Sequence, residues 1–310
     1  MIARTDYFGK SGWIILTLVL LLPSWGVTET RSVNCNAGGS IGEALKTLKP
    51  GDTLLVSGTC VESVNITEQF DGITLDGQGT ATVNGPDPAV NPIQLVAVRN
   101  VTIKGLRVTG GRDGINLRGA QMIFIENNII EQTGRDGMQV HRGTFAMITG
   151  NTIQNNARHG IVVHESSSAR IGFASATAAN EPRPNLIQGN GGNGIHVLRA
   201  SNARIAANTI RNNRQNGINV ERVSQADIAS NTIEGNARNG IRVTQNSGVQ
   251  LGADTGTGFE ELPNSTGTPN GQYGLDCSLG AYADGRLGSL MGRSGATNFT
   301  WGQDIVSLLP

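Results

Sequence analysis

Apolar and polar residues alternate in short segments that recur along the chain every 23 residues. Each segment follows a glycine, and the residues one and three positions after that glycine are apolar. Successive glycines lie 23 or 34 residues apart, and 34 is one repeat of 23 plus an insertion of 11. These glycines are Gly114, Gly137, Gly160, Gly194, Gly217, Gly240 and Gly274. The alternation predicts one β-strand per repeat, with one face toward a core.

Asparagine occupies two further positions of the repeat. The first column is Asn128, Asn151, Asn185, Asn208 and Asn231, and the second is Asn156, Asn190, Asn213 and Asn236. The short amide tolerates left-handed turns, and stacked amides can hydrogen-bond from one repeat to the next. An isoleucine follows two residues after each member of the first column. We therefore expect three strands per repeat, joined by Asn/Gly turns and stacked about 4.8 Å apart as parallel strands.

The segment from Asn151 to Val163 and its copies resemble the repeats of the right-handed β-helix, or pectate-lyase-like, superfamily. The resemblance covers residues 93–277 and implies an all-β fold, a right-handed parallel β-helix solenoid of nine or ten coils with about 23 residues per coil. This superfamily includes lyases, hydrolases, epimerases, binding proteins and inert stalks, so the resemblance leaves the chemistry open.

The flanking segments predict export and capping. Residues 1–26 read as a signal peptide, because two basic residues precede an apolar run that is too short to cross a bilayer. An uncleaved membrane anchor is the alternative. Residues 27–92 predict an N-terminal cap and the first coils, with a short helix opened by a capping box at Ser40 and Glu43. Residues 278–310 predict a C-terminal cap in which Phe299 and Trp301 cover the last coil.

Composition narrows the class of partner. Lys+Arg and Asp+Glu both number 24, and this balance argues against a nucleic-acid partner.

Export permits disulfides, and of three possible pairings we expect Cys35 with Cys60, since both lie in the N-terminal segment. Cys277 falls in an inward column of the repeat, which predicts a buried free thiol.

Polar residues that could carry chemistry gather in three columns around the repeat glycine. The catalytic candidates are Asp113, Asp136, His141 and His164. The candidates for substrate binding are Arg118, Gln139, His159, His196, Asn219 and Arg242. Carboxylates one coil apart can split their pKa values and serve as acid and base in glycoside cleavage, and an arginine can neutralise a uronate.

A structural interpretation competes with this one. Asparagine replaces aspartate in the later coils, and both residues suit a turn before glycine. Two stacked imidazoles without a third ligand do not make a metal site, so we expect no metal and no cofactor. The acidic clusters and Asp-Asp or Asp-Pro-His-Asp motifs of the enzymatic branches are absent from the sequence. The two inserted segments, Gly172–Pro184 and Gly252–Asn264, each contain one aromatic residue and leave room for a shallow saccharide groove.

The sequence thus favours a secreted, periplasmic or cell-surface protein that binds an extracellular or cell-envelope polysaccharide, and it leaves open whether the protein also processes that polymer. The alternatives are a lyase, hydrolase or epimerase that acts at the Asp/His face, and a non-catalytic structural surface protein. Whether the chain is an enzyme stays open, with the missing motifs favouring binding. After signal cleavage no stable membrane span is expected.

Overall fold

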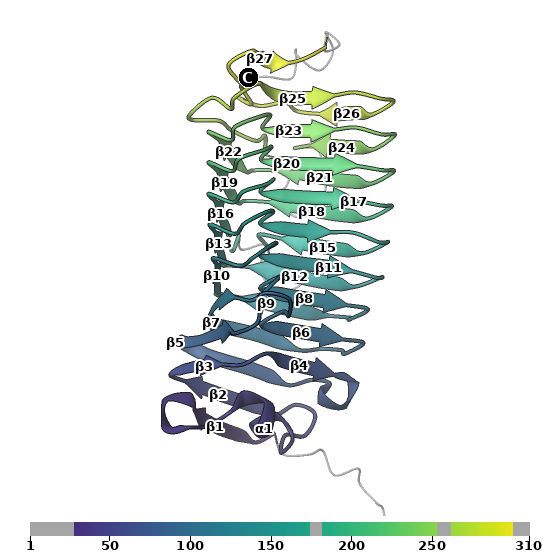
Figure 1. Ribbon diagram of the computed structural model, residues 1–310. Coiled ribbons are helices and arrows are strands. Elements are labelled where there is room, and N and C mark those ends of the chain that lie inside the picture. The colour runs from purple at the N-terminus through teal and green to yellow at the C-terminus, as the bar shows by residue number, and fades with distance from the viewer. Residues whose placement is uncertain (1–27, 174–181, 253–261, 300–310) are drawn as a thin grey trace, which may run out of the picture.

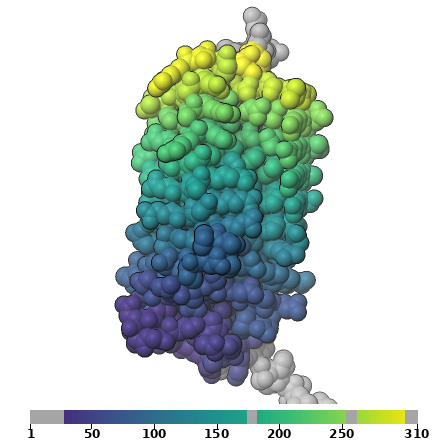
Figure 2. Space-filling model, viewed as in Figure 1, coloured from purple at the N-terminus to yellow at the C-terminus, as the bar shows by residue number. Residues whose placement is uncertain are grey.

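Each repeat forms one coil of a right-handed parallel β-solenoid in the computed structural model, which describes residues 28–173, 182–252 and 262–299. The described coils number about 11, slightly more than the sequence predicts. They stack into an elongated column (Figures 1 and 2). Residues 1–27, which contain the expected signal peptide, and Trp301 lie outside the described residues. No described helix is long and apolar enough to span a membrane.

Every regular coil contributes one strand to each of three faces. Face 1 is a sheet of ten parallel strands. These are β4 (Val64–Thr67), β6 (Ile93–Val96), β8 (Ile115–Arg118), β11 (Met138–His141), β14 (Ile161–Val163), β17 (Ile195–Leu198), β20 (Ile218–Glu221), β23 (Ile241–Val243), β25 (Tyr273–Cys277) and β27 (Gly295–Thr297).

Faces 2 and 3 share the long strands β5 (Thr74–Gly85) and β7 (Thr102–Gly110), which bend from one face to the other. The other strands of face 2 are β1 (Thr30–Asn34), β2 (Thr53–Ser57), β9 (Ile123–Glu126), β12 (Phe145–Thr149), β15 (Ser168–Ile171), β18 (Asn202–Ala206), β21 (Gln225–Ala229), β24 (Gly248–Leu251) and β26 (Tyr282–Gly285). The other strands of face 3 are β3 (Thr59–Val61), β10 (Ile129–Glu131), β13 (Thr152–Gln154), β16 (Leu186–Gln188), β19 (Thr209–Arg211) and β22 (Thr232–Glu234).

The core is a set of in-register apolar columns. On face 1 the residue after each repeat glycine pairs with its equivalent in the next coil, as Met138 pairs with Ile161 and Ile161 with Ile195. These side chains are fully buried. Cys277 continues the second inward column opposite Val243, as the sequence predicts, and is a free thiol that is partly buried against the core.

The two asparagine columns form hydrogen-bonded ladders between coils, the first at the turn from face 2 to face 3 and the second at the turn from face 3 to face 1. Asn151, for example, donates from Nδ2 to Asn185 Oδ1, and that same oxygen accepts the backbone N–H of Asn151. The expected left-handed turn geometry is displaced by one residue, however: the positive φ angles occur just before the ladder, at Asn127 and Gly150. The ladder asparagines are therefore suited to their positions by hydrogen bonding between coils and not by left-handed backbone.

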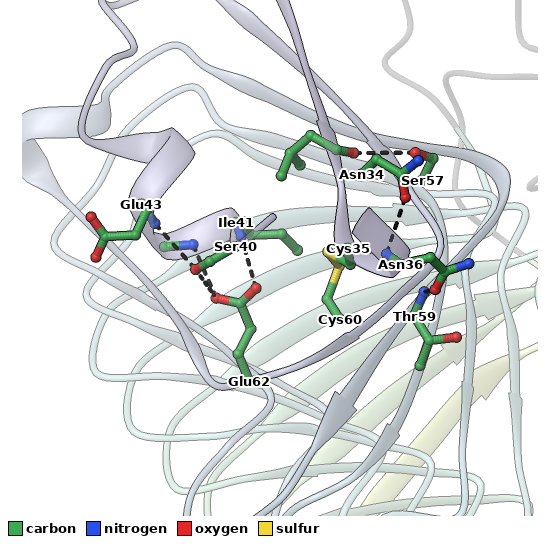
Figure 3. The surroundings of a disulfide bond; sticks show 12 residues. Asn34, Cys35, Asn36, Ser40, Ile41, Glu43, Ser57, Thr59, Cys60 and Glu62 are labelled. Atoms are coloured by element: carbon green, nitrogen blue, oxygen red, sulfur yellow. Dashed lines mark hydrogen bonds between the residues drawn. A yellow bond between two sulfur atoms is a disulfide. The ribbon is translucent and has the colours of Figure 1, made fainter. Parts of the chain in front are cut away.

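A short cap covers the N-terminal coil (Figure 3). It contains the 3-10 helix η1 (Cys35–Ala37) and the helix α1 (Ile41–Leu45), and a second 3-10 helix, η2 (Glu68–Phe70), follows β4. Ser40 caps α1 as expected, by accepting the N–H of Glu43, but the Glu43 carboxylate pairs with Lys46 and does not complete the capping box. The carboxylate of Glu62 accepts the N–H groups of Ile41 and Gly42. The Cys35–Cys60 disulfide ties this cap to β3. At the other end, Phe299 packs against the core.

Candidate functional site

The outer side of face 1 brings the predicted site columns together. The residues two after each repeat glycine are paired coil to coil in the order Asn116, Gln139, Val162, His196, Asn219 and Arg242. Arg118 pairs with His141 in a parallel column, and His164 directly follows β14. The columns thus lie side by side, as the sequence predicts.

The central column of outward residues on face 1, which we call its floor, is more buried than residues of a solvated surface. Asn116, Gln139 and Asn219 are each 3–6% exposed, and His196 is 8% exposed. Coils about 4.8 Å apart leave little room between neighbouring outward side chains, which therefore cover one another. A ligand on face 1 would therefore meet closely packed polar side chains and not side chains that project into solvent.

The residues just before the repeat glycines form a ladder of hydrogen-bond acceptors. A side-chain atom of each residue accepts the backbone N–H of its equivalent in the next coil, at 2.8–3.2 Å. The acceptor atoms are, in order, Asn91 Oδ1, Asp113 Oδ1, Asp136 Oδ1, His159 Nδ1, Asn193 Oδ1, Asn216 Oδ1 and Asn239 Oδ1. Aspartate, asparagine and neutral histidine share this column because each supplies an acceptor atom.

Both aspartates of the predicted pair are buried and engaged. Asp136 is 0% exposed, and its second oxygen accepts from Gln139 Nε2 at 2.9 Å. The guanidinium groups of Arg135 and Arg158 lie 3.5 Å from its carboxylate. Burial raises the pKa of Asp113, and the neighbouring charge of Asp136 adds to the rise. The coil-to-coil ladder thus uses one oxygen of each carboxylate.

His141 and His164 stack in parallel, with ring centroids 5.0 Å apart and an interplanar angle of 2°. Their Nε2 atoms face Asn116 Oδ1 at 3.2 Å and Gln139 Oε1 at 3.3 Å. Both Nδ1 atoms lie near the carboxylate of Glu165, at 3.7 and 3.6 Å. Burial lowers the pKa of both imidazoles, that of His164 to about 4, and the charge of Glu165 partly offsets this effect. Both rings are therefore neutral near pH 7.

This stack does not have the geometry of a metal site. Because the two rings are stacked in parallel planes, their nitrogen lone pairs point in parallel directions, whereas the lone pairs of metal ligands converge on one point. Within the part of the chain that the structure describes, the one close group of three potential ligands is Cys35, Cys60 and Glu62, and its two cysteines form the disulfide.

A second histidine pair lies further along the same face. The rings of His159 and His196 meet edge to face at 4.9 Å. Glu221 Oε1 lies 3.3 Å from His196 Nε2 without hydrogen-bond alignment, and Oε2 accepts from Asn219 Nδ2 at 3.1 Å. The adjacent His196 and the hydrogen bond from Asn219 hold the pKa of the Glu221 carboxyl below its usual range. Sequence reasoning missed Glu221, because a single acidic residue in a column of mixed composition carries no periodic signal.

Arginines border face 1 on both sides. One row precedes the strands and one ends or follows them, and most of these side chains are about half exposed. The rows are Arg112, Arg135 and Arg158, and Arg118, Arg142, Arg199 and Arg222. Their carboxylate neighbours are Asp113, Asp136, Glu165 and Glu221. Seven guanidinium groups thus face four carboxylates, and the rims of the face carry excess positive charge.

Comparison with known proteins identifies the fold. The profile of the family described as "Right handed beta helix region" matches residues 54–178 and 168–258. No curated protein sequence matches the chain. Among solved structures, pectate lyase Pel9A superposes with a TM-score of 0.57 and 14% identity, covering 90% of this chain and 81% of the lyase.

Two other structures are similar. ORF18 of Geobacillus virus E2 has a TM-score of 0.59 and 11% identity, with 82% of this chain and 58% of the viral chain covered. The A-module of the Azotobacter vinelandii mannuronan C-5 epimerase AlgE6 has a TM-score of 0.48 and 15% identity, with coverage of 88% and 89%. At these identities the similarity shows a shared fold alone.

Proposed function

Because the chain belongs to the right-handed β-helix family, we propose that it is an exported protein that binds an acidic polysaccharide along the outer side of face 1. The proposed location is the cell surface, the periplasm or the extracellular medium. The Cys35–Cys60 disulfide supports an oxidising compartment. Pectate lyase Pel9A, which shares the fold, is named for its polysaccharide substrate.

The observation that carries this proposal is the pair of arginine rows on either side of a packed polar floor. A uronate polymer presents carboxylates at regular intervals along its length, and a guanidinium group binds a carboxylate through two parallel hydrogen bonds. The arginine rows repeat with the coils, so an extended acidic chain that runs along the solenoid axis meets guanidinium groups in successive coils. Arg118 and Arg199, at or beside the ends of β8 and β17, are the most direct contacts.

Binding is favoured over catalysis because the structure uses the catalytic candidates to hold the coils together. The Asp113 and Asp136 carboxylates accept backbone N–H groups from the next coil, and both are buried. A lyase, hydrolase or epimerase activity has one observation in its favour: Glu165 lies within 3.7 Å of the imidazoles of both His141 and His164. Such a carboxylate can accept and return a proton that an imidazole takes from a sugar.

The test is affinity electrophoresis of the mature protein in gels that contain polygalacturonate, alginate or uncharged dextran. We expect retardation by the acidic polymers alone, and weaker retardation at high salt because salt screens exposed charges. Arg118→Ala with Arg199→Ala should lower the affinity about tenfold, the equivalent of about 1.4 kcal/mol. Arg211→Ala is the matched control, because Arg211 lies on face 3 and bonds to the uncharged Gln188. Equal loss in the control, or no retardation, would contradict the proposal.

The same samples test for catalysis. Unsaturated ends, new reducing ends or an altered epimer ratio would reveal turnover. Asp113→Asn with Asp136→Asn is the informative variant, since asparagine keeps the acceptor atom that later coils use at this position. Turnover that disappears in this folded variant would establish an enzyme, whereas binding without product supports a binding protein. A chain that neither binds nor turns over any polymer would be a structural surface protein.

A further inference from the structure

A polar cavity lies on the outer side of face 2, away from the arginine rows. Its volume is about 270 Å³, and it spans the coils of β15, β18 and β21. The lining residues are Ser168, Asn202, Ala203, Arg204, Gln225, Ala226 and Asp227. Ser168, Asn202 and Gln225 are in register on adjacent strands, and the same holds for Arg204 and Asp227. Two neighbouring columns of face 2 therefore supply the polar groups.

The lining chemistry differs from that of face 1. A hydroxyl and two amides supply uncharged donors and acceptors, and Arg204 and Asp227 contribute one charge of each sign, with Nε 3.6 Å from Oδ2. The Asn202 side chain is exposed, and the described part of the chain offers it no side-chain hydrogen bond. A ligand rich in hydroxyl groups can pair with such a mixture, whereas a polyanion gains little from it.

An aromatic side chain from two coils away borders the cavity. The hydroxyl of Tyr282 donates to Gln225 Oε1 at 2.7 Å, across 57 residues of sequence. The ring crosses the intervening coil over Gly248, where a Cβ would lie 2.1 Å from a ring carbon. Any larger residue at position 248 would displace the ring. Tyr282 remains 53% exposed, so part of its ring faces solvent beside the polar lining.

We infer that this cavity is a second carbohydrate site, which binds one or two residues of an uncharged sugar through Asn202, Gln225 and Asp227 with Tyr282 as an aromatic platform. An aromatic face beside convergent amide and carboxylate groups suits a pyranose, which has apolar C–H faces and a rim of hydroxyls. The volume is somewhat below the ~300–1,000 Å³ of sites for drug-sized ligands, which fits a short segment and not a long chain. The site is independent of acidic-polymer binding on face 1.

The test is saturation-transfer NMR of the mature full chain with uncharged oligosaccharides of glucose, galactose, mannose, xylose and N-acetylglucosamine. We expect at least one series to bind. Asn202→Ala and Tyr282→Ala should each weaken binding about tenfold. Tyr282→Phe should have a smaller effect, because it keeps the ring and removes only the hydroxyl. Asn65→Ala is the matched control, an exposed asparagine on β4 of face 1.

The two proposed sites can fail separately. Asn202→Ala should leave retardation by polygalacturonate or alginate unchanged, and Arg118→Ala should leave neutral-sugar binding unchanged. Absence of binding by every neutral series at tens of millimolar would overturn the inference, as would an equal loss in Asn65→Ala. Asn202→Ala keeps the test valid even if Tyr282→Ala disturbs the last coils, because the Asn202 side chain is exposed.

Discussion

His159 accepts the backbone N–H of Asn193 through Nδ1, at 2.8 Å, in a column where every other coil from β6 to β23 uses the oxygen of an aspartate or asparagine. The imidazole must be neutral to accept this bond, with its proton on Nε2. Gly192 makes room for the ring, because a Cβ at that position would lie 2.4 Å from Nδ1. A histidine can thus replace a carboxylate in the ladder as long as it stays unprotonated.

The first prediction concerns substitution at this position. His159→Asn should fold with little loss of stability, since asparagine is the residue that continues the ladder at positions 193, 216 and 239. His159→Ala leaves the buried N–H of Asn193 without its acceptor and should cost about 1–3 kcal/mol. Urea unfolding followed by circular dichroism measures both. Equal costs for the two variants would show that the acceptor atom is not what position 159 requires.

The second prediction is acid sensitivity from the same group. Burial, with the charge of His196 adding to it, lowers the pKa of His159 from its ordinary 6.5 to about 3. Below pH 6.5 the His159 imidazole is therefore protonated in the unfolded chain but stays neutral in the folded chain. The contribution of His159 to the free energy of unfolding is therefore fully present above pH 6.5. It is lost as the pH falls from 6.5 toward 3, by an amount on the order of a few kcal/mol.

His164 and His141 should contribute in the same direction, since burial lowers both of their pKa values. The raised pKa of Asp113 acts in the opposite direction near and above pH 4. The contribution of His159 is isolated by subtracting the unfolding free energies of His159→Asn from those of the wild type between pH 7.5 and 4. A difference that does not change with pH would contradict the proposed protonation.

Much of this architecture can be predicted from the sequence, because it depends on residues that recur. The spacing of Gly137, Gly160 and Gly194 locates the strands of face 1, and the two asparagine columns locate the turns from face 2 to face 3 and from face 3 to face 1. Periodicity also places Asp136 beside His159. The periodicity does not reveal that the Asp136 carboxylate accepts the backbone N–H of the next coil, since an aspartate at this position is compatible with a structural role and with a catalytic one.

Features that occur once in the fold are absent from the sequence pattern. Glu221 meets His196 only because coils stack in one particular register. Tyr282 reaches Gln225 over a single glycine in an intervening coil. The position of Phe173 in an inserted segment predicts an aromatic residue available to a ligand, yet Phe173 is fully buried, with the guanidinium groups of Arg170 and Arg204 within 6 Å of its ring. Only three-dimensional packing could correct that interpretation; the aromatic residue of the other insertion, Phe259, lies outside the described residues.

The third prediction explains why the repeat residue is glycine. A Cβ on Gly160 would lie 2.5 Å from the carbonyl oxygen of Gly194 in the next coil and 2.7 Å from Ile187 Cγ2. Neither the stacked backbone nor the buried core can move away, so Gly160→Ala should cost about 3 kcal/mol. Gly143→Ala is the control: its φ of +73° is strained for alanine, but nothing lies within 4 Å of the added carbon. It should cost only about 1 kcal/mol.

The measurement for both glycine variants is the urea midpoint together with amide hydrogen exchange of β14 and β17. Local loss of protection at these strands in Gly160→Ala would locate the damage at the contact between the two coils. If both variants lose the same stability, close stacking of coils is not the reason for glycine in this column.

The last prediction concerns the N-terminal cap. The Cys35–Cys60 bridge spans 25 residues, and closing a loop of that size stabilises a folded chain by about 3 kcal/mol. Dithiothreitol should therefore lower the thermal midpoint of the wild type. Cys35→Ala with Cys60→Ala should start from the lower midpoint and show no further response, whereas Cys277→Ala should respond to dithiothreitol as the wild type does, because Cys277 is a free thiol.

Since the bridge ties η1 to β3, reduction should loosen the cap before the coils. Hydrogen exchange should rise first in α1 and β2 while β17 and β20 stay protected. Uniform loss of protection along the solenoid would mean that the cap and the coils unfold as one unit.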